Sequence, residues 1–172
     1  MEKKMEIYEG LGFEPMKESD VECLAPIMKA AFNADAKLHL GQEAGGPPGY
    51  DNGDFLRKWY FENQVHAYVI KKDGTPIGGV NVFDYNNGEG YLGNMFIDPT
   101  WANQGFGHLT WQYIEQKHPK IVKWKTDTPK FAKRNLYFYI EKCGFKATNL
   151  DDSNEFCFLE KIIENHLNLN NE

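Results

Sequence analysis

The best candidate for a binding site is a short segment between a predicted strand and a predicted helix. The strand ends at Ile97-Asp98-Pro99, and the helix begins near Gly105. A turn of this kind points several backbone N–H groups one way at the positive end of the helix dipole, which suits an anion such as a pyrophosphate. Gly105 and Gly107 carry no Cβ, so the backbone there can approach phosphates closely. A turn whose glycines serve packing alone explains this segment equally well.

Two other nucleotide-binding motifs do not fit this segment. A P-loop requires GxxxxGK[ST], which the chain lacks. The dinucleotide fingerprint GxGxxG is incomplete, because residues 105–110 read GFGHLT and lack the third glycine. Asp127 lies near the place where that motif has an acidic residue, but Pro129 closes its segment and the preceding strands are predicted to be antiparallel. A dinucleotide site is therefore a weak alternative.

At this point the chain resembles the GNAT superfamily of N-acyltransferases. The acetyl-CoA motif of that family, Q/R-x-x-G-x-G/A after an apolar-x-Pro strand end, resembles Ile97-Asp98-Pro99 followed by residues 102–107 (ANQGFG). A second signature, an asparagine near the start of a helix that ends in FYxxxGF, resembles residues 135–145 (NLYFYIEKCGF). Residues 45–51 (GGPPGYD) also resemble a loop that some acetyltransferases carry before the second helix. The resemblance covers about residues 11–160.

Two positions depart from the family pattern. Ala102 stands where a glutamine or arginine usually begins the phosphate loop, so that side-chain contact is lost while the backbone can still bind phosphate. Tyr139 lies five residues before the glycine of the second motif, where four is the commoner spacing, and Ile140 occupies the commoner place. We favour a one-residue insertion, because Phe138-Tyr139 preserves the aromatic pair after Asn135.

The resemblance implies transfer of an acetyl group from acetyl-CoA, a cosubstrate, to a primary amine of a small molecule or peptide. The amine attacks the thioester directly in a ternary complex, after losing a proton that it holds with a lysine-like pKa of about 10.4. Backbone N–H groups at the end of strand 91–97 are the candidates to stabilise the oxyanion. Residues in the two motifs are the implied cofactor-binding residues: Met95, Phe96, Ile97, Ala102, Asn103, Gln104, Gly105, Phe106, Gly107, His108, Asn135 and Tyr139.

The chemistry also needs an acid and a base. Tyr139 is the implied acid for the departing thiolate, because its position resembles that of the family's tyrosine. Glu89 and Asp84 flank the hairpin before strand 91–97 and are the candidate bases, although each also fits a solvated turn carboxylate. The acidic residues of the segment 33–54 would suit a cationic amine. No metal is predicted, because the spacing does not suit ligation at the other histidines: His39, His66, His118 and His166.

The elements that position these residues follow from hydrophobic periodicity and turn residues. They are strand 14–16, a helix from 19 or 20 to 32, helix 55–61, strands 65–70, 76–85 and 91–97, helix 105–117, strand 121–125, helix 131–142, and strands 146–148 and 156–162. This order predicts an α/β (α+β) fold with a mixed, mostly antiparallel central sheet and helices on both faces, as in GNAT proteins. The crossover through helix 105–117 makes its two flanking strands parallel.

Some segments carry more local expectations. Residues 1–10 look like a polar lead-in, and Glu14-Pro15-Met16 looks like an edge strand because proline cannot donate a ladder hydrogen bond. Pro26 predicts a kink or a broken start in its helix. Residues 33–54 contain five glycines and two prolines, which predicts a long loop that is uncommon unless functional. Gly78-Gly79 is a candidate bulge.

Composition limits the class of protein. The 172 residues, 41% hydrophobic and 26% charged, suit a single domain over 1–172 with a core at about 11–160 and a polar tail at about 163–172. A net charge of −6 argues against nucleic acid as a partner. The three cysteines form no CxxC pair, which predicts neither a disulfide framework nor a zinc knuckle. No apolar run approaches the roughly 20 residues of a membrane helix and residues 1–10 do not resemble a signal peptide, so we predict a cytoplasmic protein without membrane contact.

Two alternatives and one property stay open. The chain could be a catalytically degenerate GNAT-fold module that binds acyl-CoA as a sensor, which Ala102 and the shifted Tyr139 favour. It could also be an unrelated nucleotide-binding protein, which tight binding of NAD or ATP without a response to CoA would identify. An aromatic content of 15% is compatible with a homodimer.

Overall fold

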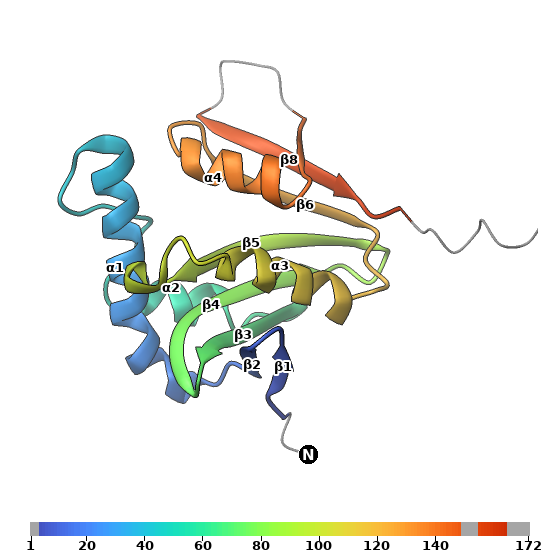
Figure 1. Ribbon diagram of the computed structural model, residues 1–172, viewed down its shortest axis with the longest axis horizontal. Helices are drawn as coiled ribbons and strands as arrows, with labels where there is room; N and C mark the ends of the chain where they lie inside the picture. Colours follow the sequence, from blue (N-terminus) through green and yellow to red (C-terminus); the bar gives the residue numbers. More distant parts are fainter. Residues whose placement is uncertain (1–3, 149–154, 165–172) are drawn as a thin grey trace, which may run out of the picture.

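The computed structural model describes residues 4–148 and 155–164, which form one sheet covered by helices on both faces (Figure 1). The strand order is β1-β2-β3-β4-β5-β6-β8-β7. The strands are β1 (Glu6–Tyr8), β2 (Leu11–Pro15), β3 (Val65–Lys72), β4 (Thr75–Asp84), β5 (Glu89–Ile97), β6 (Lys123–Pro129), β7 (Lys146–Ala147) and β8 (Phe156–Ile162). The helices are α1 (Val21–Leu40), α2 (Asp54–Trp59), α3 (Phe106–Lys117) and α4 (Lys133–Tyr137), with 3-10 turns at Glu18–Asp20 and Pro99–Trp101 and a π-helical turn at Phe138–Lys142.

The two faces of the sheet carry separate cores, because successive side chains of a strand point to opposite faces. On one face Tyr68 and Ile70 of β3 pack with Trp111 of α3, and α4 adds to the same cluster. On the other face Val69 packs with Leu24 of α1, and α2 completes that cluster. The predicted mixed sheet with helices on both faces is therefore confirmed.

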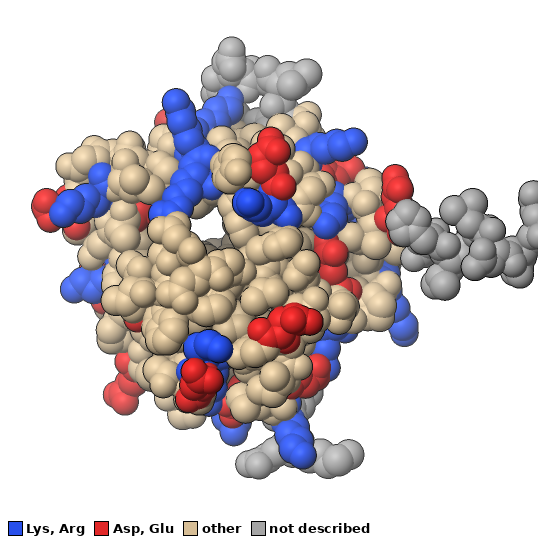
Figure 2. Space-filling model, viewed as in Figure 1, with Lys and Arg blue, Asp and Glu red and all other residues tan. Residues whose placement is uncertain are grey.

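Strands β5 and β6 separate after a short parallel contact. Within the described residues their register covers three pairs: Glu89↔Lys123, Gly90↔Trp124 and Tyr91↔Lys125. The Thr126 hydroxyl then donates to the Leu92 carbonyl at 2.9 Å, after which β5 stays beside β4 and β6 beside β8. Figure 2 shows an opening into the molecule at this level, between α4 and the N-terminal end of α3. The parallel crossover is as predicted, and the separation creates a space between the two halves of the sheet.

A bulge in β5 changes which of its side chains face which core. Against β4, Val82 pairs with Leu92 and Asn81 with Asn94, which leaves Gly93 between the two pairs. Leu92 therefore packs with the α3 core, while Phe96, four residues on, packs with the α1 core. The sequence predicted a bulge at Gly78-Gly79, and a register shift does occur next to Gly78, but the bulge at Gly93 was missed.

Several predicted boundaries were wrong. Helix α1 does not end at residue 32 but continues through Pro26 to Leu40, where Gly41 (φ 65°) ends it in the left-handed conformation that glycine adopts readily. The loop predicted at 33–54 is therefore confined to residues 41–53. The glycines and prolines of this shorter segment led to the prediction of a loop that began too early. Residues 33–40 instead form the last turns of α1, in which Ala36 is buried.

The N-terminal and sixth strands also differ from prediction. Residues 1–10 are not only a lead-in, because β1 pairs with β2 through a turn at Glu9 and Gly10, both with positive φ. Strand β2 is consequently internal rather than at the edge, and Pro15 is tolerated because it is the last residue of the strand. The strand predicted at 121–125 runs instead from Lys123 to Pro129. The tail predicted at 163–172 lies largely outside the described residues, among which no helix is long and apolar enough to span a membrane.

Candidate active site

The glycine turn before α3, predicted to bind phosphate, is open at Gly105. The Asp98 carboxylate accepts hydrogen bonds from the backbone N–H and the hydroxyl of Thr100, at 3.0 and 2.9 Å, and so holds the turn that follows β5. Asn103 and Gly105 then adopt left-handed conformations with φ of 63° and 80°. Apart from Gly105 itself, its chain neighbours and the nearby helix backbone, no heavy atom of the described residues lies within 4 Å of the place a Cβ would occupy on Gly105. The first N–H groups of α3, which have no partners within the helix, therefore begin beside open space.

Gly107 has a packing function that the sequence alone could not distinguish from phosphate binding. A Cβ on Gly107 would lie 3.2 Å from the ring of Phe138, which belongs to the π-helical turn after α4. The absence of a side chain at Gly107 therefore allows α3 and this turn to approach closely. The neighbouring Ala102, Phe106 and His108 are half-buried, while Gln104 is exposed on the turn.

Two side chains of α4 reach the predicted cofactor-binding elements. Arg134 donates a hydrogen bond to the Asn103 side chain and so connects α4 to the glycine turn. Asn135 donates to the Thr128 hydroxyl of β6 at 3.4 Å. Basic side chains gather over α4 above the opening in Figure 2. At the end of β5, Met95 and Ile97 pack toward the α3 core, and Phe96 is buried on the other face. These last three can contribute backbone groups to the opening.

The π-helical turn accommodates the extra residue before Gly144. The Cys143 N–H donates to the Phe138 carbonyl at 3.0 Å, a five-residue step in place of the usual four, and Gly144 (φ 83°) ends the helix. The Tyr139 ring packs against Phe138 and Phe145, with centroids 5.4 and 5.8 Å away. Burial raises the pKa of Tyr139 above its usual value, and negative charge on Cys143, Asp127 and Asp35 raises it further. The phenol is therefore held in its protonated form.

A cavity of about 980 Å³ lies on the α1 and α2 side of the sheet. Its lining residues come from the loop 41–53, from α2, and from β4, β5, β6 and β8. Because it is lined by Tyr91 of β5 and Asp127 of β6, the cavity spans the place where these two strands separate. Aromatic rings form much of its wall: Phe55, Trp59, Phe83, Tyr85, Tyr91 and Phe156.

Two polar groups in this cavity were not recognised as site residues from the sequence. Asp127 accepts a hydrogen bond from the Tyr91 hydroxyl, and burial together with this bond raises the pKa of Tyr91 above its usual value. Asn81 donates to the Trp59 carbonyl at 2.9 Å, while its Oδ1 is buried without a partner among the described residues. An unpartnered buried acceptor and a carboxylate that line the same cavity suit a ligand that brings hydrogen-bond donors.

The two carboxylates predicted as bases lie away from this cavity. Glu89 stands at the closed end of the β5–β6 contact, where it lies 3.7 Å from both Lys123 and Lys125. Asp84 is the last residue of β4 and lies beside His66 and His118. Neither is among the residues that line the cavity. The acidic loop residues divide similarly, because Asp54 lines the cavity whereas Asp35 lies on α1.

Comparison with known proteins decides the family. The model of the family described as "Acetyltransferase (GNAT) family" matches residues 32–145. The chain belongs to the GNAT family. It is therefore an acetyltransferase, which removes the alternative of an unrelated nucleotide-binding protein. The chain is also 34% identical over 133 residues to the uncharacterized protein YrkN of Bacillus subtilis (strain 168), covering 77% of this chain and 71% of that protein.

Solved GNAT structures share the fold at low sequence identity. A PaiA N-acetyltransferase from Thermoplasma acidophilum in complex with coenzyme A has a TM-score of 0.68 and 14% identity, covering 88% of this chain and 98% of that chain. The ribosomal-protein-S18-alanine N-acetyltransferase from Escherichia coli has a TM-score of 0.67 and 13% identity, covering 92% and 98%. A spermidine N-acetyltransferase SpeG chimera from Vibrio cholerae and hSSAT has a TM-score of 0.65 and 16% identity, covering 90% and 96%.

Proposed function

We propose that this GNAT protein transfers the acetyl group of acetyl-CoA to a primary amine that has an apolar body, by direct attack in a ternary complex. The observation that carries the proposal is the cavity lined by both β5 and β6. The cavity lies on the α1 and α2 side of the sheet, and α3 with its glycine turn lies on the other side. Two ligands can therefore approach each other through the separated strands.

The residues present fit an acetyl-CoA molecule in the opening, where the cosubstrate supplies the acyl thioester. The open space at Gly105 and the first N–H groups of α3 suit its pyrophosphate. Arg134 and Asn135 border the same opening from α4. Backbone N–H groups of β5 beyond Tyr91, where β6 no longer pairs with the strand, are placed to donate to the thioester oxygen. Coenzyme A in the Thermoplasma acidophilum structure and acetyl-CoA in one from Elizabethkingia anophelis support this ligand.

The cavity fits an amine better than a neutral or anionic acceptor. Aromatic faces such as Tyr85 and Tyr91 attract a cation while they bury an apolar chain. The Trp59 ring already carries a cation, because Lys58 Nζ lies 4.8 Å from its centroid. Asp127 supplies the opposite charge, and the Asn81 carbonyl oxygen can accept a hydrogen bond from the ammonium group. Among the structural neighbours, the names of the spermidine and ribosomal-protein-alanine acetyltransferases show that both small-molecule and protein amines occur as acceptors. For this chain, the aromatic walls favour an aryl-alkyl amine.

The proposed proton transfers use two residues on opposite sides of the opening. Asp127 holds the ammonium and accepts its proton, directly or through one water, so that a neutral amine attacks the thioester carbon. Tyr139, kept protonated by burial, donates its proton to the sulfur that leaves as coenzyme A. The attacking nitrogen releases its second proton to water as the C–S bond breaks, and the Tyr139 phenolate takes up a proton from water. Glu89 and Asp84, predicted as bases from the sequence, would reach the cavity only through a water relay.

An acceptor screen tests the function. Purified protein with acetyl-CoA is offered aryl-alkyl monoamines, polyamines and peptides with free N-termini, and both coenzyme A release and the acetylated product are measured. We expect the highest kcat/KM with an aryl-alkyl amine. Binding of acetyl-CoA without transfer to any amine would instead favour the acyl-CoA sensor. Transfer only to polyamines would contradict the apolar acceptor and leave the acetyltransferase activity standing.

A further inference from the structure

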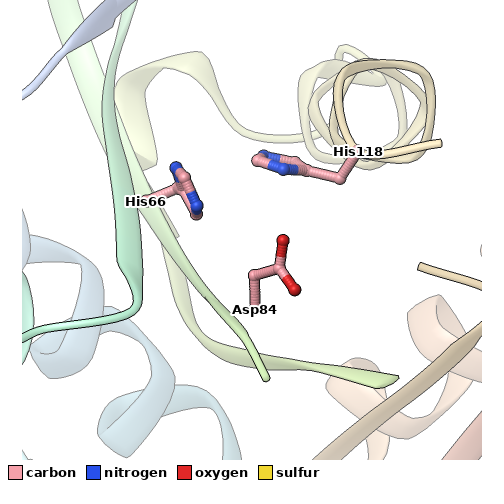
Figure 3. Close-up of side chains that lie close together, drawn as sticks. All are labelled: His66, Asp84 and His118. Atoms are coloured by element: carbon pink, nitrogen blue, oxygen red, sulfur yellow. The ribbon is translucent and has the colours of Figure 1, made fainter. Parts of the chain in front are cut away.

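A second cluster of reactive side chains lies on the face of the sheet opposite the cavity. His66 comes from β3, Asp84 ends β4, and His118 directly follows α3 (Figure 3). One potential ligand atom from each residue lies within 4.8 Å of the other two. The alternation of β3 and β4 puts His66 and Asp84 on the α3 side, with Tyr68 and Val82. The thickness of the sheet therefore separates the cluster from the acceptor cavity.

Two imidazoles and one carboxylate are a ligand set typical of divalent transition metals. Zn²⁺ binds histidine nitrogens and carboxylate oxygens at about 2.0–2.2 Å, so that two ligand atoms around a tetrahedral ion lie roughly 3.3 Å apart. Because the three atoms already lie within 4.8 Å of one another, side-chain rotations alone can bring them to this spacing. In Figure 3 the three side chains converge on a common space from three directions.

Neighbouring groups orient two of the three side chains. The Tyr68 hydroxyl lies 3.1 Å from His118 Nε2, which leaves Nδ1 of the same ring for a metal. The Asp84 Oδ1 accepts the Asn86 N–H at 2.9 Å, which fixes the rotation of the carboxylate. Hydrogen bonds of this kind to the ligands are a regular feature of metal sites.

We propose that His66, Asp84 and His118 bind one divalent transition-metal ion, of which Zn²⁺ fits best, with water at the fourth position. The ion joins the ends of β3 and β4 to the C-terminal end of α3. None of these three residues is among the described residues that line the cavity. The metal site is therefore structural or regulatory rather than catalytic. The proposal does not depend on the identity of the amine.

The test is a zinc titration of metal-stripped protein against a competing chromophoric chelator. A Cys23→Ser background removes the exposed thiol, which could otherwise bind zinc. We expect one Zn²⁺ per chain, a rise in Tm with Zn²⁺ but not with Mg²⁺, and visible absorption of four-coordinate Co²⁺. Asp84→Asn keeps the size of the side chain and an oxygen for the Asn86 N–H, and we expect it to weaken zinc binding about 10- to 100-fold.

Two further variants make the outcome decisive. His66→Gln should weaken binding as Asp84→Asn does. Asp73→Asn removes a carboxylate from the turn between the same two strands, far from the cluster in the β3–β4 register, and should leave zinc affinity unchanged. The proposal is overturned if the folded protein binds no zinc at micromolar concentration, or if it binds zinc equally well in all three variants.

Discussion

At the scale of single residues, the proposed acid and base come from two different elements. Tyr139 belongs to the π-helical turn, and Asp127 belongs to β6. Their charges influence each other, since Asp127 contributes to the raised pKa of Tyr139. This coupling supports the proposal that the two side chains act in one reaction. The phenol hydroxyl and the carboxylate can each be removed by a substitution that nearly keeps the size of the side chain.

Tyr139→Phe should lower kcat about 10²-fold or more, because the departing thiolate loses its proton donor. The affinity for acetyl-CoA, measured by thermal shift, should stay within a few-fold of the wild-type value. Tyr137→Phe, two residues away and exposed, is the matched control and should have no effect. Equal activity of the two variants would exclude Tyr139 as the acid.

The pH profile gives a second test of Tyr139. Its pKa is raised above the ordinary value of 10.0, so the proton donor stays protonated as the pH rises through 10. The wild-type kcat should therefore not decline between pH 8 and pH 10. A decline in that range that disappears in Tyr139→Phe would show that the phenol ionises earlier than the structure implies.

Asp127→Asn should lower kcat/KM for the amine about 10²-fold at pH 7, since the ammonium loses both its counter-charge and its base. The loss should shrink with rising pH, because the free-amine fraction increases about tenfold per pH unit below its pKa. Asp51→Asn is the control, because Asp51 is exposed in the loop 41–53, and it should leave kcat/KM unchanged. A deficit that stayed constant from pH 7 to pH 10 would argue against a base at this position.

At the scale of elements, two glycines shape the acceptor side and the cofactor side of the proposed site. A Cβ on Gly93 would lie 2.8 Å from Asn81 Oδ1, so the missing side chain leaves room for this buried acceptor. Gly105 instead needs its left-handed conformation, with φ of 80°, to begin α3 beside open space. One glycine therefore belongs to the acceptor side and the other to the cofactor side.

Substitution of each glycine by alanine should separate the two sides. Gly93→Ala should raise KM for the amine several-fold with little change in acetyl-CoA affinity, because its methyl group displaces the Asn81 side chain. Gly105→Ala should weaken acetyl-CoA binding and lower stability by about 1–2 kcal/mol, the cost of a left-handed alanine. Steady-state kinetics and denaturant unfolding measure both. The same pattern in the two variants would contradict this division.

The π-helical turn allows a test of the insertion. Deleting Ile140, which is partly exposed, should convert the turn to regular α-helix and leave Tyr139 in place, so that at least a tenth of the activity remains. Deleting Tyr137, on the other side of Tyr139, rotates Asn135 by about 100° relative to Tyr139 and should abolish activity. Equal activity of two folded deletion variants would show that the spacing is unimportant.

At the scale of the whole molecule, the opening separates the part built on β1–β5 from the part built on β6–β8 and α4. A ligand that contacts both parts should stabilise the fold against unfolding. At acetyl-CoA near 100 times Kd, one site adds about 2.7 kcal/mol. For a domain of this size, this corresponds to a rise in Tm of roughly 5–10 °C. CoA should raise the Tm similarly, while ATP and NAD should not. If neither acetyl-CoA nor CoA raised the Tm, that result would contradict the cofactor site.

The sequence by itself determined the local parts of this protein. The meander of β3 to β5, the glycine turn, α3 and the FYxxxGF-like helix depend on residues close together in the chain, and all were predicted. The end of α1 was missed because the glycine-rich loop after it dominated the local signal. Gly93 carried a weak signal, since glycine inside a strand often marks a bulge.

Only the tertiary structure decided which distant residues share a site. Asp127 joins Tyr91 because β5 and β6 run parallel and then separate, and neither the register nor the point of separation can be read from spacing along the chain. His66 and His118 lie 52 positions apart in the sequence, and the packing of α3 on β3 and β4 brings them to Asp84. Local patterns specify elements through short-range sterics and periodicity. The acceptor cavity and the proposed metal site depend instead on long-range strand register and helix packing.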